Sequence, residues 1–344
     1  MSHYVDESAP AFTLLTDLAS RQLGASVVSA NDELFAQREN LINPWAPSFD
    51  QADFGHKGKV YDGWETRRRR QPGNDWAIVR LGTPGVIRGV VVDTAWFRGN
   101  YPPFISIEAL ASDAYLSAEE LATAKWSTLV AKSTSVGDSK NYFQVSDQRW
   151  WSHVRLSIYP DGGVARLRVH GEVVADPRFL SGTVDLIAAE NGGRLVRTSD
   201  AFYSSPAQVI MPGRAQNMGD GWENARRRED GNDFAVFALG HRGTIRHLEV
   251  DTQYFVGNAP GWARVSAADV SDGDLDSAVW TDVLAKRAVL PDTRQRFLAE
   301  QSMEATHVRL DVYPDGGLSR FRLWGEVSDD ARAAAADCWR AHSS

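Results

Sequence analysis

The chain has 344 residues, of which 43% are hydrophobic and 24% charged, and its formal net charge is −8. This composition is ordinary for a globular protein and excludes fibrous and fully disordered classes, while the negative charge disfavours a nucleic-acid partner. The single cysteine, Cys338, excludes an intrachain disulfide, and neither a signal-peptide pattern nor an apolar run near the roughly 18 residues of a membrane helix is present, so we expect a cytoplasmic protein with no membrane partner.

In chain order, the first predicted element is a short helix over 16–23 that ends at Gly24. Two strands are predicted at 76–81 and 89–93, and a single helical turn at 117–121.

Alternating apolar residues then predict strands at 154–158 and 166–170. The sequence Pro-Asp-Gly-Gly at 160–163 is typical of a tight turn, so these two strands are expected to form an antiparallel hairpin. An alanine-rich segment at 329–341 predicts a C-terminal helix that carries Trp339.

The chain is a tandem repeat. Residues 62–76 match 220–234 at ten of fifteen positions, and 153–173 match 307–327 at fourteen of twenty-one. Each copy is long enough to be a domain. We expect a boundary within 174–182, giving repeats at 1–176 and 177–344. Many short strands joined by Gly/Pro turns predict an all-β protein of two tandem jelly-roll β-sandwiches, galactose-binding-like in type, with few short helices.

The strongest candidate site is the charged segment 62–76. Arginine binds carboxylates through a planar pair of N–H groups, so Arg67 and Arg68 suit an anionic ligand. Trp64, Asn74 and Asp75 are further candidate binding residues, and Glu65 is a candidate acid or base. The alternative for this segment is an ion-pair network that only ties the loop to the sheet.

A second segment, 93–102, reads as a loop at the end of a strand. It contributes Asp93 as a candidate catalytic group and Asn100 as a candidate binding residue, although both residue types also stabilise turns. Lys59 and His153 are alternative catalytic candidates, and a lone histidine before a strand is more often a core or edge residue.

No zinc, P-loop or Rossmann motif occurs, so no cofactor is certain. Oxygen ligands from Asp and Glu leave a divalent metal ion open, and the metal ligands are unknown. The first copy is the more cationic around the motif, because it has Lys59 and Arg67 where the second copy has Asn217 and Ala225, and we expect it to hold the main site.

The motifs at 57–76, 93–102 and 153–173, with their weaker second copies, resemble the allantoicase family over most of the chain, from about Phe12 to Val327. The resemblance implies two jelly-roll repeats in a cytosolic homo-oligomeric hydrolase. It also implies the reaction: allantoate and water give ureidoglycolate and urea in purine degradation.

That chemistry matches the candidate residues. An arginine pair would hold the carboxylate of allantoate, and the departing urea needs an acid while the attacking water needs a base. Glu65 and Asp93 are the first candidates for those roles, with Lys59 or His153 as alternatives. The competing hypothesis is a non-catalytic carbohydrate- or anion-binding protein, since sandwiches of this kind often bind sugars.

Overall fold

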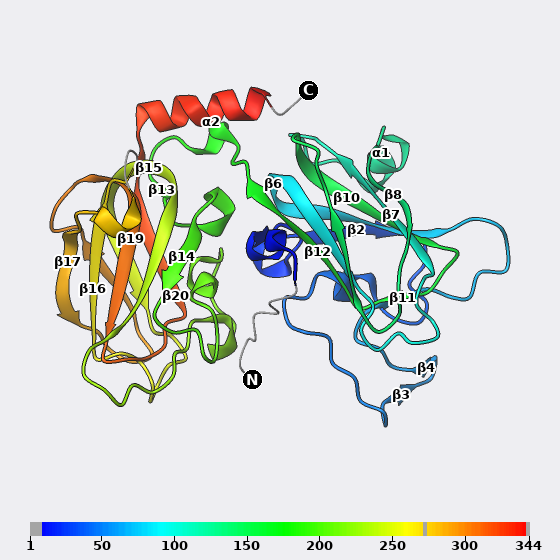
Figure 1. Ribbon diagram of the computed structural model, residues 1–344, viewed down its shortest axis with the longest axis horizontal. Coiled ribbons are helices and arrows are strands. Elements are labelled where there is room, and N and C mark those ends of the chain that lie inside the picture. The colour runs from blue at the N-terminus through cyan, green and yellow to red at the C-terminus, as the bar shows by residue number, and fades with distance from the viewer. Residues whose placement is uncertain (1–8, 271–273, 342–344) are drawn as a thin grey trace. The chain divides into compact units, whose positions relative to one another are not determined.

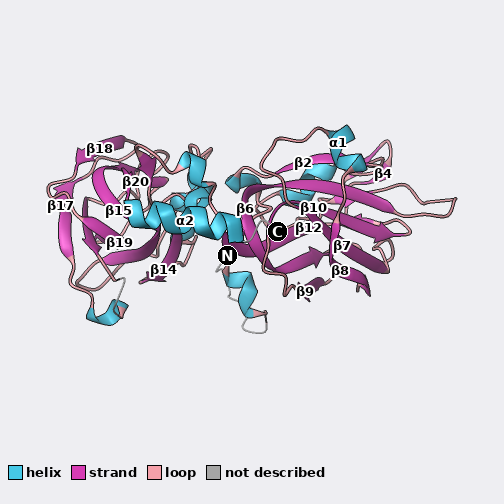
Figure 2. Ribbon diagram, turned by 90° about the horizontal axis from the view of Figure 1, so that it is seen from above, coloured by secondary structure: helices cyan, strands magenta, loops and turns pink. Residues whose placement is uncertain are grey.

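The computed structural model describes residues 9–270 and 274–341. It forms two compact units, which divide between Val174 and Ala175, and each contains one β-sandwich (Figure 1). Strands dominate and helices are few and short, as Figure 2 shows. The predicted all-β, duplicated sandwich fold is confirmed. No helix in the described part of the chain is long and apolar enough to cross a membrane.

Each layer of the first sandwich is an antiparallel sheet, and one long strand takes part in both. The first half of β6 (Asp75–Asp93) pairs with β2 and β10, and β10 continues to β7 and β8. The second half of β6 pairs with β12 and β9, and β12 continues to β1. The remaining bounds are β1 Thr16–Asp17, β2 Ser26–Ala30, β7 Phe104–Leu110, β8 Ser127–Thr134, β9 Lys140–Gln144, β10 Trp150–Tyr159 and β12 Arg166–Val173.

The second sandwich repeats this arrangement strand for strand. Its shared strand is β15 (Asp233–Asp251), which pairs with β14 and β19 in one layer and with β18 and β20 in the other. The other strands are β13 Val184–Asp185, β14 Arg194–Thr198, β16 Trp262–Ala268, β17 Thr281–Ala288, β18 Arg294–Leu298, β19 Glu304–Tyr313 and β20 Arg320–Val327.

The predicted hairpin around 160–163 is wrong. Instead of pairing with each other, both strands pair with β6: β10 with residues 75–80 and 85–86, and β12 with residues 85–87 and 89–93. The turn therefore carries the chain from one sheet to the other. The alternating pattern identified both strands correctly but did not specify their partners, because period-two alternation only tells which face of a strand is buried.

The helix predictions have mixed outcomes. A six-residue helix, α1 (Ala118–Thr123), begins at Ser117 with reciprocal side-chain capping by Glu120, and α2 covers Asp329–Ala341, as predicted. The helix predicted over 16–23 is wrong for most of its length. Thr16 and Asp17 form a strand, and only Arg21–Leu23 is a 3-10 turn, which ends at Gly24 with φ of 100°.

A buried aromatic cluster fixes the loops at one end of the first sandwich. Trp64 and Phe97 are fully buried, and the Phe97 ring stacks on Tyr61 at 4.7 Å between centroids. A Cβ on Gly163 would lie 2.0 Å from the Phe97 ring, so only glycine fits in this turn. The second sandwich has the same arrangement with Phe255 and Gly317, where the corresponding distance is 1.9 Å. Segments 62–66 and 160–164 are thereby held together.

Candidate active site

A pocket of about 380 Å³ lies where three loop segments of the first sandwich meet. The segments are 65–70, 99–103 and 160–162, and Phe35 adds to the wall. We call this the first-sandwich pocket. Its lining is Phe35, Glu65, Thr66, Arg68, Arg70, Gly99, Asn100, Tyr101, Pro103, Pro160, Asp161 and Gly162.

Backbone hydrogen bonds assemble the three segments. The two-residue strands β5 (Trp64–Glu65) and β11 (Gly163–Val164) pair with each other, and the Gly163 N–H donates to the Asn100 carbonyl oxygen at 2.7 Å. The Asp161 carboxylate accepts the backbone N–H of Arg69 at 2.7 Å, which ties the arginine segment to the turn. The pocket is therefore built on the same contacts that close the end of the sandwich.

Glu65 is the titratable acid best placed for chemistry in this pocket. Asn100 Nδ2 donates a hydrogen bond to Glu65 Oε1 at 2.7 Å. Burial raises the pKa of the Glu65 carboxyl above its ordinary value, and the Asn100 hydrogen bond offsets part of that rise. A carboxyl group with a raised pKa can hold a proton, or accept one, closer to neutrality.

Arg68 and Arg70 supply positive charge to the same pocket. Both side chains are exposed, and neither guanidinium has a hydrogen bond or ion pair with another residue in the part of the chain that the structure describes. Their N–H groups are thus available to a ligand. A carboxylate is the small anion that this geometry suits, because two guanidinium groups can bind its two oxygens.

The neighbouring arginines have structural partners. Arg67 Nε forms an ion pair with Asp32 Oδ2 at 2.5 Å, and Arg67 is not among the residues that line the pocket. Arg69 Nη1 binds Asp75 Oδ1 at 2.7 Å, and Arg227 and Asp233 repeat this pair in the second sandwich. The segment 67–70 therefore alternates between arginines held by the fold and arginines that face the pocket.

Several of the sequence-predicted residues lie outside the pocket. Trp64 is fully buried and its Nε1 donates to the Asp32 carbonyl oxygen at 2.7 Å. Asn74 Nδ2 donates to the Asp75 carbonyl oxygen, and the Asp75 side chain is buried in its ion pair with Arg69. These contacts favour the structural alternative for Trp64, Asn74 and Asp75.

Lys59 and Asp93 are also placed elsewhere. Lys59 lies in the small hairpin of β3 (Phe54–Gly55) and β4 (Gly58–Lys59), with its Nζ 4.6 Å from the centroid of the Phe54 ring. Asp93 ends β6 and accepts the backbone N–H of Ala95 at 2.8 Å. Burial raises the pKa of Asp93, while nearby basic side chains lower it.

His153 is a core residue on β10. It is 1% exposed, its Nδ1 lies 2.9 Å from the Ser152 hydroxyl, and its Nε2 has no partner among the described residues. Burial, followed by the positive charge of Arg80, lowers the pKa of His153 to about 4. The ring is therefore neutral at pH 7 and does not line the pocket.

Arg70, Tyr101 and Asp161 also line the pocket, although they were not among the candidates predicted from the sequence. The repeat could have indicated Arg70 and Asp161, because the second copy has the same residue types, Arg228 and Asp315, at the matching positions. Tyr101 offered no such signal, since its counterpart is Ala259.

The second sandwich repeats the central hydrogen bond. Asn258 Nδ2 donates to Glu223 Oε1 at 2.8 Å, and Arg226 occupies the position of Arg68. The walls differ, because Ala259 and Gly261 stand where the first copy has Tyr101 and Pro103. The second copy thus keeps the Glu–Asn pair but lacks two side chains that enclose it.

A metal centre does not fit the residues described. Within 9–270 and 274–341 no three His, Cys, Asp or Glu side chains converge as metal ligands do. We therefore derive no chemical step through a metal ion.

The repeat model of one family matches both sandwiches. The model described as "Allantoicase repeat" covers residues 16–174 and 184–328. The chain belongs to the allantoicase family. It is 52% identical over 327 residues to a probable allantoicase of Nocardia farcinica, covering 94% of this chain and 98% of that one. A probable allantoicase of Streptomyces coelicolor is 50% identical over 339 residues, covering 94% and 89% of the two chains.

Solved allantoicase structures agree with the fold. The crystal structure of allantoicase from Saccharomyces cerevisiae is 34% identical, covers 90% of this chain and 92% of its own, and superposes with a TM-score of 0.77. Family membership favours the hydrolase over the non-catalytic carbohydrate- or anion-binding alternative.

Proposed function

We propose that the first-sandwich pocket is where this member of the allantoicase family binds allantoate and hydrolyses it to ureidoglycolate and urea. That reaction, a step of purine degradation, is the activity of the family to which both repeats belong. The observation that supports the location is the half-buried carboxyl of Glu65 in one pocket with two arginines that have no partner among the described residues.

Arg68 and Arg70 would bind the carboxylate of allantoate. This substrate is a carboxylate whose α-carbon carries two ureido groups, so holding the carboxylate places that carbon inside the pocket. The neutral ureido groups present both N–H donors and carbonyl acceptors, which match the Asn100 amide and the Asp161 carboxylate on the facing segments.

Glu65 would then move the proton in both halves of the reaction. Its protonated carboxyl donates to the departing ureido nitrogen, the bond from that nitrogen to the α-carbon breaks, and neutral urea leaves. The lone pair of the second ureido nitrogen forms a C=N bond to the α-carbon. Water adds to that carbon and gives its proton to the Glu65 carboxylate, which restores the acid and leaves ureidoglycolate.

Removing Arg68 should weaken substrate use far more than removing its neighbour. We expect Arg68→Ala to lower kcat/KM for allantoate by about 10- to 100-fold, the scale of a lost charged hydrogen bond. Arg67→Ala is the matched control. It removes an exposed ion pair with Asp32, which contributes at most about 1 kcal/mol to stability. Urea release measures both variants, and an Arg67→Ala loss equal to that of Arg68→Ala would contradict the assignment.

The Asn100 hydrogen bond should set the pH profile. Because this bond stabilises the Glu65 carboxylate, Asn100→Ala should raise the pKa of Glu65 further. A general acid works in its protonated form, so the decline of kcat/KM on the alkaline side should move to higher pH in Asn100→Ala. A rate loss with no movement of the profile would show that Asn100 binds substrate without tuning Glu65.

We further propose that the enzyme acts in the cytoplasm as a homo-oligomer. Support comes from the resemblance to the family and from the single cysteine, which suits a reducing compartment. Sedimentation of the purified protein measures the assembly, and cell fractionation measures the location.

A further inference from the structure

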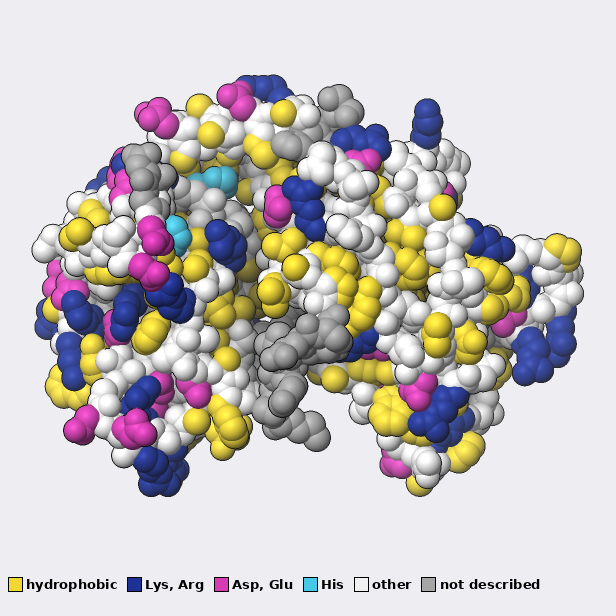
Figure 3. All heavy atoms as spheres, viewed as in Figure 1, with side chains coloured by type: hydrophobic (Ala, Val, Ile, Leu, Met, Phe, Trp, Pro, Cys, Tyr) yellow, Lys and Arg dark blue, Asp and Glu magenta, His cyan; other side chains and the backbone are white. Residues whose placement is uncertain are grey.

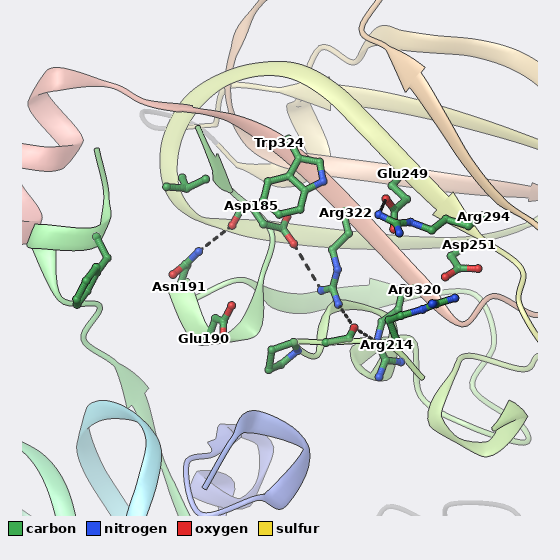
Figure 4. A pocket seen from close by; sticks show the side chains of 14 residues that line it. Asp185, Glu190, Asn191, Arg214, Glu249, Asp251, Arg294, Arg320, Arg322 and Trp324 are labelled. Atoms are coloured by element: carbon green, nitrogen blue, oxygen red, sulfur yellow. Dashed lines mark hydrogen bonds and ion pairs between the residues drawn. The ribbon is translucent and has the colours of Figure 1, made fainter. Parts of the chain in front are cut away.

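A larger cavity, of about 460 Å³, lies in the second sandwich (Figure 4). Its floor is one face of the sheet formed by β13, β20, β15 and β18, and the loop that contains Arg214 covers part of it. Four arginines and four acidic residues line it, together with the indole of Trp324. We call it the second-sandwich cavity. Neither Glu223 nor Asn258, which form the second copy of the Glu–Asn pair, lines this cavity.

Part of the matching face of the first sandwich is covered by an aromatic cluster around Phe12. The Phe12 ring packs against Tyr142 and His170, with centroids 6.4 Å and 6.1 Å away. A Cβ on Gly89 would lie 2.5 Å from the same ring, so Phe12 occupies the space directly over the sheet.

The second copy replaces this filling with polar and charged groups. His170 and Val91 correspond to Trp324 and Glu249, and Gly89 corresponds to His247. Tyr142 corresponds to Arg296, and on the covering loop Ala46 corresponds to Arg214. The two copies share part of the charged framework, because Asp185, Asp251, Arg320 and Arg322 match Asp17, Asp93, Arg166 and Arg168 of the first copy. The second copy adds Arg214, Glu249 and Trp324 to it.

Arg322 supplies a buried donor to the cavity. It is 7% exposed, and its Nη2 donates to the Gly213 carbonyl oxygen at 2.8 Å. Its Nη1 lies 3.5 Å from Asp185 Oδ2 and has no hydrogen bond to any described residue. A buried N–H group without a hydrogen bond is costly, and an anionic ligand would remove that cost. Arg214, at the exposed edge, offers a second guanidinium.

Acceptors lie on the neighbouring strand. Asp251 is 2% exposed, and its Oδ1 accepts the backbone N–H of Gln253 at 2.9 Å. Glu249 is already held by Arg294 at 2.7 Å and by Arg296 at 3.1 Å. Asp251 therefore has more capacity than Glu249 to accept N–H groups from a ligand.

We propose that the second-sandwich cavity is a binding site for a small ureido-carboxylate. Arg322 and Arg214 bind the carboxylate, Asp251 accepts the ureido N–H groups, and the planar ureido group packs on the Trp324 indole. Equal numbers of acidic and basic side chains disfavour a multiply charged anion such as a phosphate ester, because it would lie against four carboxyl groups. Allantoate and ureidoglycolate both belong to the proposed class.

Calorimetric titration of the full chain with N-carbamoylglycine tests the proposal. This compound has one carboxylate and one ureido group and lacks the second ureido group that the reaction releases. We expect two binding events per chain, one of them lost in Arg68→Ala. The other should weaken about tenfold or more in Trp324→His and in Arg214→Ala. These two substitutions install the residues that the first sandwich carries at the same positions, so both proteins should fold.

The outcomes separate this inference from the proposed active site. A single event that only Arg68→Ala removes would overturn the second site. A single event that only Trp324→His removes would keep it and would overturn the placement of allantoate in the first-sandwich pocket. Acetate and glycine are the matched controls, and affinity for either equal to that for N-carbamoylglycine would overturn the ureido assignment. Displacement by ureidoglycolate, or by allantoate in Glu65→Gln, then distinguishes product from substrate.

Discussion

Glu65→Gln is expected to lower kcat for allantoate by roughly 100- to 10,000-fold, the usual contribution of a positioned acid or base. Glutamine keeps the size of the side chain and one carbonyl oxygen that can still accept the Asn100 hydrogen bond at the position of Glu65 Oε1. The pocket should therefore stay folded while the transferable proton is lost. Urea release under saturating allantoate measures the loss, and thermal unfolding checks that the protein is intact.

Glu223→Gln is the matched control within the same chain, because Asn258 holds Glu223 as Asn100 holds Glu65. We expect it to keep most of the activity, since Ala259 and Gly261 leave the second glutamate without the walls that Tyr101 and Pro103 provide. Equal losses in the two variants would show that both copies catalyse the reaction. A larger loss in Glu223→Gln would move the main site to the second sandwich.

The second large effect concerns stability toward acid. Burial lowers the pKa of His153 to about 4, whereas an unfolded histidine titrates near its ordinary value of 6.5. The unfolded chain therefore binds a proton at higher pH than the folded chain does. The stability that His153 contributes is complete above pH 6.5 and is lost as pH falls from 6.5 to about 4, by about 3 kcal/mol in total.

We expect the free energy of unfolding, measured with denaturant across that pH range, to change more with pH in the parent protein than in His153→Gln. Other histidines whose pKa burial lowers, such as the half-buried His307, are present in both proteins, so the difference between the two curves isolates His153. NMR titration of the His153 ring in the folded parent is an independent measurement. A midpoint near 6.5 would contradict the prediction, even if the variant failed to fold.

The strands β10 and β12 could be predicted from the sequence, but their pairing could not, and the strands predicted at 76–81 and 89–93 are one continuous strand, β6. Leu156 and Ile158 are buried and alternate with polar residues such as Arg155 and Tyr159, which are partly exposed, and this pattern is visible without a structure. Which strand lies beside β10 depends on contacts distant in sequence. The helix predicted over 16–23 had Gly24 as its stop signal. In the structure Gly24 ends only the 3-10 turn Arg21–Leu23, and the segment before it begins as a two-residue strand.

The candidate site, like the fold, could be predicted from the sequence only in outline. Glu65, Arg68 and Asn100 meet in the first-sandwich pocket, and sequence analysis named all three. The sequence alone does not distinguish Arg68 from Arg67 or Arg69. Adjacent arginines in an irregular segment point in different directions, and the sequence does not show which direction each side chain takes. Lys59 looked informative because the second copy lacks it, yet it lies in a hairpin of the longer first-copy loop.

Charged side chains of both signs lie close together on the second sandwich. On the second sandwich, Figure 3 shows basic and acidic side chains interspersed over the face in view. Pairs such as Arg242 with Asp269, at 2.8 Å, account for part of this mixture.

The long strand β6 has a consequence for how each sandwich comes apart. Residues 77–80 are bordered by β2 and β10, and residues 89–93 by β9 and β12, so a single backbone segment is central to both layers. Neither layer can lose its central strand without breaking the hydrogen bonds of the other. The amide protons of the two layers should therefore exchange with solvent together, at one slow rate, while those of the loops around the pocket exchange earlier. A ligand that enters this pocket would thus require movement of the loops alone, and the sheets beneath would keep their register throughout turnover.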